Sequence, residues 1–250
     1  MTTDLKSIGL DFPRWQDAVE AAIATDNLAV IGEVRGGQLI QYSDASGAQI
    51  IILAVEPFAT FAGFESTAQV FGHVSMINDV LAFVEVVDAF GHQLASVTLN
   101  LAQGPLLVDA PAQQWQQLHL TALALDYTVY PTPEAYTAAT GTMQPAQLNS
   151  PGAEIIESSS GAAAPDASVT FAGRVIESEY RTSELTGQRF IHVVLDSVVS
   201  FDVCLPDAPE LPEKGAILEG KGVLTGSVIV ASGCGGSGGC SCGSGGCGNH

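Results

Sequence analysis

The stretch LASVTLNL, at residues 94–101, decides the fold class of this chain. Apolar and small polar side chains alternate along it, with Ser96, Thr98 and Asn100 standing between Val97, Leu99 and Leu101. A period of two residues is typical of a β-strand that has one face in the core and the other in water. The stretch therefore predicts a half-buried strand.

Other apolar runs of strand length, separated by turn residues, lie on both sides of this stretch. They occupy residues 28–34, 38–42, 49–55, 68–76, 80–87, 118–130, 168–178, 189–198, 200–205 and 216–230. Turn sequences such as Arg35-Gly36-Gly37 and Glu213-Lys214-Gly215 separate neighbouring runs. The sequence therefore predicts a mainly β protein.

Apolar residues recur at helical spacing only in short segments of the sequence. One lies within residues 11–23 and contains Trp15. Another lies within residues 112–117, just after Pro111, and contains Trp115. We expect a few short helices, with both tryptophans as packing anchors.

Composition divides the chain into four parts. Residues 136–167 are rich in Ala, Ser, Thr, Gly and Pro and hold few large apolar side chains, which is typical of a linker. We therefore predict a β-rich domain with short capping helices at 1–135 and a second small β domain at 168–231. Residues 232–250 lack apolar surface to bury, which predicts a disordered Gly/Cys tail.

A faint internal repeat bears on the architecture of the two predicted domains. Gly72-His73-Val74 resembles Gly173-Arg174-Val175, and residues 83–88 resemble residues 191–196. Two unrelated β-meanders can share this much by chance. If the repeat is a duplication, each domain is a small five-stranded barrel or sandwich, and an OB-like barrel is the commonest such solution.

Charge narrows the classes of partner. The 250 residues include 27 acidic and 8 basic ones, which gives a net charge of −19. Such a surface repels phosphate backbones and anionic lipids, so we expect neither nucleic acid nor a membrane as partner. Residues 1–135 hold 15 of the acidic residues, most simply as a solvated face rather than a surface for cations or a basic partner. With no signal peptide or transmembrane run in the sequence, we expect a cytoplasmic protein.

The C-terminal tail is the segment that points most directly to chemistry. Residues 233–250 have the sequence GCGGSGGCSCGSGGCGNH. The tail holds four of the five cysteines of the chain and ends in a histidine, so the predicted metal ligands are Cys234, Cys240, Cys242, Cys247 and His250. Thiolates and imidazole are ligands for Zn²⁺, Cu⁺ or an iron–sulfur cluster. Because the spacing lacks the C-x2-C of structured zinc modules, we expect a flexible site of modest affinity.

Two other interpretations of the tail stay open. In composition, its Gly-Cys and Ser-Cys steps resemble the core of microcin-like thiazole/oxazole-modified peptides. That resemblance implies a precursor whose tail is modified to azoles, although more than two hundred residues precede the tail and such leaders are short. The plain alternative is a solvated tether with incidental cysteines.

The remaining candidates favour structural roles. His73, His92, His119 and His192 form no local ligand pair, and we expect them to be ordinary strand or turn residues. Glu177 and Glu179 share a strand face, as solvated glutamates routinely do, and the lone Cys204 lies in the apolar run FDVCL, where a buried position is expected.

No catalytic constellation is evident in the sequence. We therefore predict a noncatalytic binding or assembly protein that docks a protein partner through its acidic β domains and presents the tail thiols to a metal ion or cluster. The alternatives are a modified precursor and an enzyme whose residues converge from separate strands.

Overall fold

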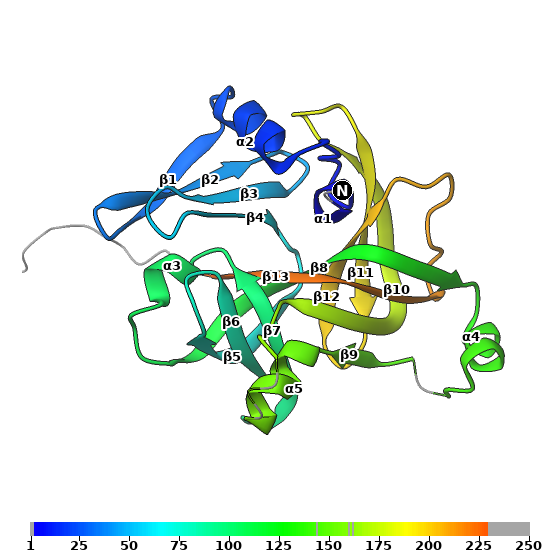
Figure 1. The fold of residues 1–250 in the computed structure, drawn as a ribbon. Coiled ribbons are helices and arrows are strands. Elements are labelled where there is room, and N and C mark those ends of the chain that lie inside the picture. Colours follow the sequence, from blue (N-terminus) through cyan, green and yellow to red (C-terminus); the bar gives the residue numbers. More distant parts are fainter. Residues whose placement is uncertain (1–2, 144, 160, 162, 230–250) are drawn as a thin grey trace, which may run out of the picture.

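The computed structural model describes residues 3–143, 145–159, 161 and 163–229. Thirteen strands and five short helices follow one another along this part of the chain. The strands form one sheet of four strands and one of nine, which lie one above the other in Figure 1. The predicted fold class, mainly β with a few short helices, is confirmed.

The four-stranded sheet is an antiparallel meander covered by the N-terminal helices. Arg35 and Gly36 turn its first hairpin with φ of 48° and 81°, because a two-residue hairpin turn of this hand needs positive φ at both positions. Ala18 and Ala22 pack with Ile50 and Ala62 in one buried cluster under the helices. The elements are α1 (Thr3–Lys6), α2 (Trp15–Ile23), β1 (Leu28–Val34), β2 (Gly37–Ser43), β3 (Ala48–Leu53) and β4 (Ala59–Phe64).

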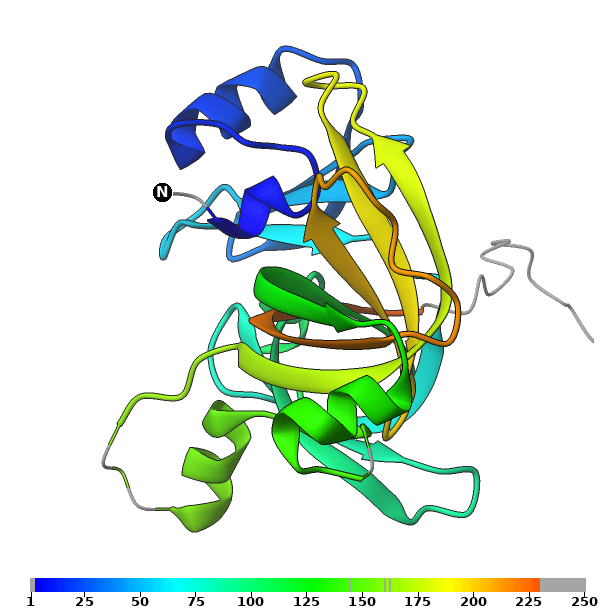
Figure 2. The ribbon, with the colours of Figure 1, turned by 90° about the vertical axis from the view of Figure 1, so that its right-hand side faces the viewer.

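The nine-stranded sheet holds the remaining strands in the order β11-β12-β8-β5-β6-β7-β13-β10-β9. One hairpin of this sheet, β10–β11, is yellow in Figure 2 and reaches up to the N-terminal helices. The strands are β5 (Gln69–Met76), β6 (Leu81–Val87), β7 (Gln93–Leu101), β8 (Gln113–Tyr130), β9 (Gln147–Asn149), β10 (Ser168–Thr182), β11 (Arg189–Asp196), β12 (Ser200–Pro206) and β13 (Ile217–Val228).

The large sheet bends back on itself through two further pairings, β8 with β13 and β10 with β11. One circuit of pairing runs from β5 through β6, β7, β13 and β8 back to β5. A second runs from β10 through β11, β12, β8 and β13 back to β10. Each circuit has one parallel pair, β7–β13 or β12–β8, and is otherwise antiparallel. The two circuits therefore have the same pattern of parallel and antiparallel pairs and share β8 and β13, although β8 follows the other three strands of the first circuit and precedes those of the second in the chain.

The stretch 94–101 forms most of β7, and its apolar side chains lie in the core as expected. Val97, Leu99 and Leu101 are fully buried. Thr98, on the opposite face, is also buried, because the segment that begins helix α5 (Pro151–Ser158) covers it. Its backbone N–H donates to Ser150 Oγ at 2.9 Å. The expectation of a wet second face is therefore wrong at this position, since a segment distant in sequence packs there.

The predicted linker, residues 136–167, contains regular structure. It includes most of α4 (Pro133–Thr140), all of β9 and all of α5. Thr132 and Ser150 cap the two helices by accepting from the backbone N–H groups of Ala135 and Ala153. The composition argument missed these helices because short capped segments of small residues can pack closely without large apolar side chains.

Strands on both sides of 136–167 share the nine-stranded sheet. The division into domains at 1–135 and 168–231 stays a prediction about folding units, and the predicted tail, 232–250, lies outside the described residues. Within the residues described, no helix combines the length and the apolarity needed to cross a membrane.

The expectations for the two tryptophans have opposite outcomes. Trp15 begins α2 and packs against the cluster beneath it, as predicted. The helix expected within 112–117 is wrong, because these residues begin β8 and pair with β5, while helix α3 (Gly104–Leu107) ends before them. Trp115 is 51% exposed and is not a core anchor.

Replacing Gly222 with alanine should destabilise the protein severely. Its added Cβ would lie 2.3 Å from the carbonyl oxygen of Leu123, which is backbone at the β8–β13 pairing and cannot swing away. We expect a loss of about 3 kcal/mol in the free energy of unfolding, measured by urea titration. The control is Gly63→Ala, whose Cβ would meet only side-chain atoms of Gln49 and Ile51 at 3.1 Å or more. Equal losses in the two variants would contradict the central place we give to this pairing.

Candidate functional site

The predicted metal ligands Cys234, Cys240, Cys242, Cys247 and His250 all lie outside the described residues. Within the part of the chain that the structure describes, no three His, Cys, Asp or Glu side chains are grouped to hold a metal ion. The chain leads into the tail from β13, where the Val228 N–H donates to Gln103 Oε1 and the Ile229 N–H donates to the carbonyl of Gln117, at 2.9 and 2.8 Å. The tail site therefore stays a prediction.

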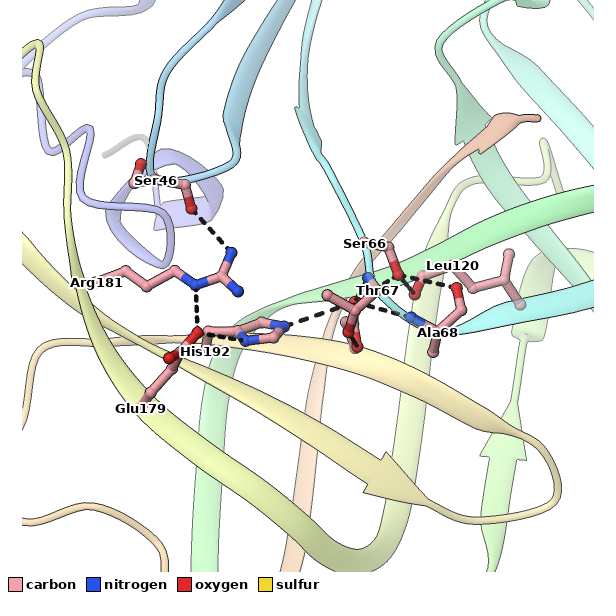
Figure 3. Close-up of polar contacts among 9 residues, drawn as sticks. Ser46, Ser66, Thr67, Ala68, Leu120, Glu179, Arg181 and His192 are labelled. Atoms are coloured by element: carbon pink, nitrogen blue, oxygen red, sulfur yellow. Dashed lines mark hydrogen bonds and ion pairs between the residues drawn. The ribbon is translucent and has the colours of Figure 1, made fainter. Parts of the chain in front are cut away.

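The densest polar grouping lies where the four-stranded sheet meets β11 and β12. We call it the buried junction, formed by Ser66, Thr67, Arg181, His192, Asp202 and the exposed Glu179. Figure 3 labels all of these residues except Asp202. It exists because β12 is buried on both faces: Phe201, Val203 and Leu205 face the large core, whereas Cys204 faces the cluster under the N-terminal helices. Asp202 is on the same face as Cys204 and is fully buried.

Asp202 is held by the segment that connects β4 to β5. Ser66 Oγ donates to its carboxylate at 2.5 Å, the Thr67 N–H donates to the same oxygen, and the Ala68 N–H lies 3.4 Å away. Burial acts to raise the pKa of Asp202, but the neighbouring His192 side chain, Ser66 and the Thr67 N–H together hold it below its usual value. The carboxylate is therefore an ionised group inside the protein at neutral pH.

His192 lies between two carboxylates. Its Nε2 is 3.6 Å from Asp202 Oδ2, and its Nδ1 is 3.5 Å from Glu179 Oε1. The Phe64 ring stacks on the imidazole with centroids 5.3 Å apart. Arg181 completes the row, with Nε donating to Glu179 at 2.7 Å and Nη1 donating to the Ser46 carbonyl at 3.1 Å. The row thus ties β10, β11 and β12 to the four-stranded sheet.

A second buried carboxylate, Asp44, joins the same two parts of the molecule. It accepts from Tyr42 and Ser46 on its own side, and from Ser183 Oγ and the Leu185 N–H of the β10–β11 hairpin, at 3.0 and 3.1 Å. Burial and the nearby Asp44 carboxylate raise the pKa of Tyr42, which stays a neutral donor. The contact between the sheets therefore rests on two charged, hydrogen-bonded anchors as well as on apolar packing.

The buried junction does not have the geometry of nucleophilic catalysis. Ser66 donates to Asp202, and no hydrogen bond joins a hydroxyl of the junction to His192 among the described contacts. Cys204 is fully buried beside it, and burial raises the pKa of its thiol, so it stays protonated. The arrangement holds two sheets together. The prediction that Cys204 is a buried apolar residue is confirmed.

The other sequence candidates are scattered over the described structure. His73 accepts the Trp115 N–H, His92 pairs with Asp88, and His119 lies 3.5 Å from Gln69. The two glutamates of β10 are both exposed, but Glu179 differs in contacting His192 and Arg181 of the buried junction. Sequence reasoning missed the roles of Asp202 and His192. The available signal was a single charged residue inside the apolar run FDVCL.

Two of the grooves on the described part of the surface contain ionisable side chains. A groove of about 730 Å³ beside Tyr180 is lined by apolar residues, two glutamates and prolines of the 207–215 loop. A smaller one, of about 280 Å³, contains Asp126 and Lys221, which form an exposed ion pair at 3.5 Å. Neither groove reaches the buried junction.

Comparison with known proteins adds no family assignment. A scan against protein-family models and searches of curated proteins and of solved structures found no match to the chain. The functional argument therefore rests on the residues themselves.

Replacing Asp202 with alanine should cost about 3–5 kcal/mol of unfolding free energy, because it removes the buried carboxylate that faces His192 and accepts from Ser66 Oγ and the Thr67 N–H. The control is Asp207→Ala, which removes an exposed carboxylate that pairs with Arg189 at 2.7 Å and should cost less than about 1 kcal/mol. Urea unfolding of both variants measures the difference. Similar costs for the two would show that the junction does not anchor the sheets.

The same carboxylate predicts how stability depends on pH. The folded-state pKa of Asp202 is lowered from 3.8, so its charged form stabilises the fold above that value and the contribution is lost as the pH falls through the folded pKa. We expect the stability difference between wild type and Asp202→Asn to be constant above about pH 5 and to shrink below about pH 4. Urea titrations across this range test it, and a difference that grows in acid would contradict it.

Proposed function

We propose that the protein is a noncatalytic binding or assembly protein that docks a protein partner through its acidic β domains. Its C-terminal tail binds a thiophilic metal ion or an iron–sulfur cluster. One observation carries the proposal. Cys204 is fully buried with a raised thiol pKa, so the chain's candidate thiolate ligands are its four other cysteines, all at positions 234–247. A thiolate, not a thiol, ligates metal.

The ligand set suits a soft metal. Four thiols and one imidazole exceed the four donors that Zn²⁺ takes, and thiolates also select Cu⁺ and iron–sulfur clusters. Free thiols persist in a reducing compartment, so the proposal includes a cytoplasmic location. The described residues 3–229 already form a packed core around β8 and β13. The tail metal therefore has no place in holding that core together.

The pairing circuits support a more detailed proposal for the fold. In the first circuit β5 pairs with β6 and β8, and β7 runs parallel to β13. In the second, β10 pairs with β11 and β13, and β12 runs parallel to β8, so the two shared strands exchange places. We propose that each circuit is a five-stranded, OB-like barrel and that the two share β8 and β13. The equivalent places of β5 and β10, which carry Gly72 and Gly173, support the duplication suggested by the faint repeat.

Two alternatives are distinguishable by mass. Conversion of one Cys or Ser of the tail to an azole removes one water and two hydrogens, about 20 Da. A precursor purified from its own cells would show multiples of this loss, whereas bound metal adds mass only under native conditions. For an enzyme, the buried junction is the candidate grouping, and its burial beneath the β4–β5 connection argues against substrate access.

Deleting residues 232–250 should abolish bound Zn²⁺ or Cu⁺ and leave the thermal midpoint nearly unchanged, because an ion held outside the core adds nothing to folding. Elemental analysis of the full chain and the truncated chain, purified under reducing conditions at neutral pH, measures the bound metal. A matched variant replaces the four tail cysteines with serine and should also lose the metal. Equal metal content in all three proteins would reject the proposal.

A further inference from the structure

Three aromatic side chains are exposed near one edge of the first pairing circuit. Phe71 on β5 is 44% exposed, Phe90 in the β6–β7 turn is 86% exposed, and Trp115 on β8 is 51% exposed. Trp115 approaches the turn closely, since a Cβ on Gly91 would lie 3.3 Å from its ring. We call these residues, with His73 and His92, the aromatic surface. Contiguous exposed aromatic area of this kind marks interaction sites.

Trp115 is held in position by a strained backbone. Its φ is +55°, an unusual value for a bulky residue, and it lies in an irregular stretch of the β5–β8 pairing. The imidazole of His73 accepts a hydrogen bond from the backbone N–H of Trp115 at 3.1 Å. It also packs edge-on against the indole ring, with the ring centroids 5.3 Å apart. The surrounding structure therefore orders this indole at the surface, as is common at binding sites.

The charges at this surface are acidic. Asp88 accepts from the N–H groups of Phe90 and His92 and from His92 Nδ1, at 2.8 to 3.0 Å. These hydrogen bonds, led by that from the His92 N–H, lower the pKa of Asp88, which stays a carboxylate. Glu85 registers opposite His73. Six of the chain's eight basic residues form ion pairs with acidic residues outside the aromatic surface.

We propose that the aromatic surface binds a lysine- or arginine-bearing segment of a protein partner. A cation stacks favourably on an indole or phenyl face, and tryptophan and arginine dominate the energetics of many protein interfaces. A second copy of this chain is a poor occupant, because each copy carries a net charge of −19. The inference deepens the proposed function, on whose protein partner it rests.

The test uses the full chain and two synthetic peptides of alternating glycine and arginine or glycine and citrulline, which match in length and differ in charge. Calorimetry should show that the arginine peptide binds more tightly. Phe90→Ala and Trp115→Gly should each weaken its binding about tenfold. Trp115→Gly suits the positive φ, so it keeps the fold, and thermal melting verifies this. Phe58→Ala removes an aromatic side chain that is 71% exposed elsewhere and should leave binding unchanged.

Equal weakening by Phe58→Ala, unchanged binding in Trp115→Gly, or equal affinity for the citrulline peptide would overturn the inference. Elemental analysis of the wild-type chain separates it from the proposed function. A wild-type chain that holds tail metal but does not bind the arginine peptide would overturn the docking inference alone. A wild-type chain that holds no metal and does not bind the peptide would overturn both.

Discussion

Strands β8 and β13 pair along the middle of the large sheet, from Tyr130 with Ile217 to Leu118 with Val228. Both pairing circuits pass through this pair, and the parallel strands β7 and β12 join it at the same row, Asn100 beside Thr225 and Asp202 beside Thr121. Thr121 and Thr225 pair with each other and are both buried. Because both circuits contain this pair, they cannot be separated without breaking it. Gly222 and Gly226 allow the two backbones to approach closely, since neither position has room for a side chain.

The four-stranded sheet and its helices cover the second face of β11 and β12. A strand with one covered face needs apolar side chains only at alternate positions. These two strands are covered on both faces, by the large core and by the cluster under the N-terminal helices. Charged residues on the second face need partners because an unpaired buried charge is costly. Ser66 and Thr67 supply them for Asp202, and Asp44 of the four-stranded part accepts from Ser183 and Leu185 of the β10–β11 hairpin. Polar contacts therefore set how the two sheets meet while apolar burial provides most of the driving force.

The proposed functions do not involve the buried junction. His192 and Asp202 of the junction, and Cys204 beside it, are buried. The proposed metal binding is therefore assigned to the tail, and the proposed recognition to the aromatic surface around Trp115. A rigid β scaffold with functional groups on turns and ends is a common division of roles, because connections tolerate the strain and exposure that binding needs. The positive φ of Trp115 is such a case, since it costs stability and orders an indole where a partner can reach it.

Local pattern alone determined the strands: alternation at 94–101 and the short apolar runs correspond to β7 and to most other strands, and FDVCL correctly placed Cys204 inside. The proposed tail ligands rest on the sequence alone, because they were chosen from the thiol and imidazole content of residues 233–250. Only the tertiary structure decided that Asp202 and His192 meet Ser66, which lies 136 residues from Asp202 in sequence. It also decided that Trp115 is exposed on a strand, and that segments on both sides of 136–167 share one sheet. Alternation specifies which side chains are buried along a strand, whereas the covering of a second face and the closure of a circuit depend on contacts between distant segments.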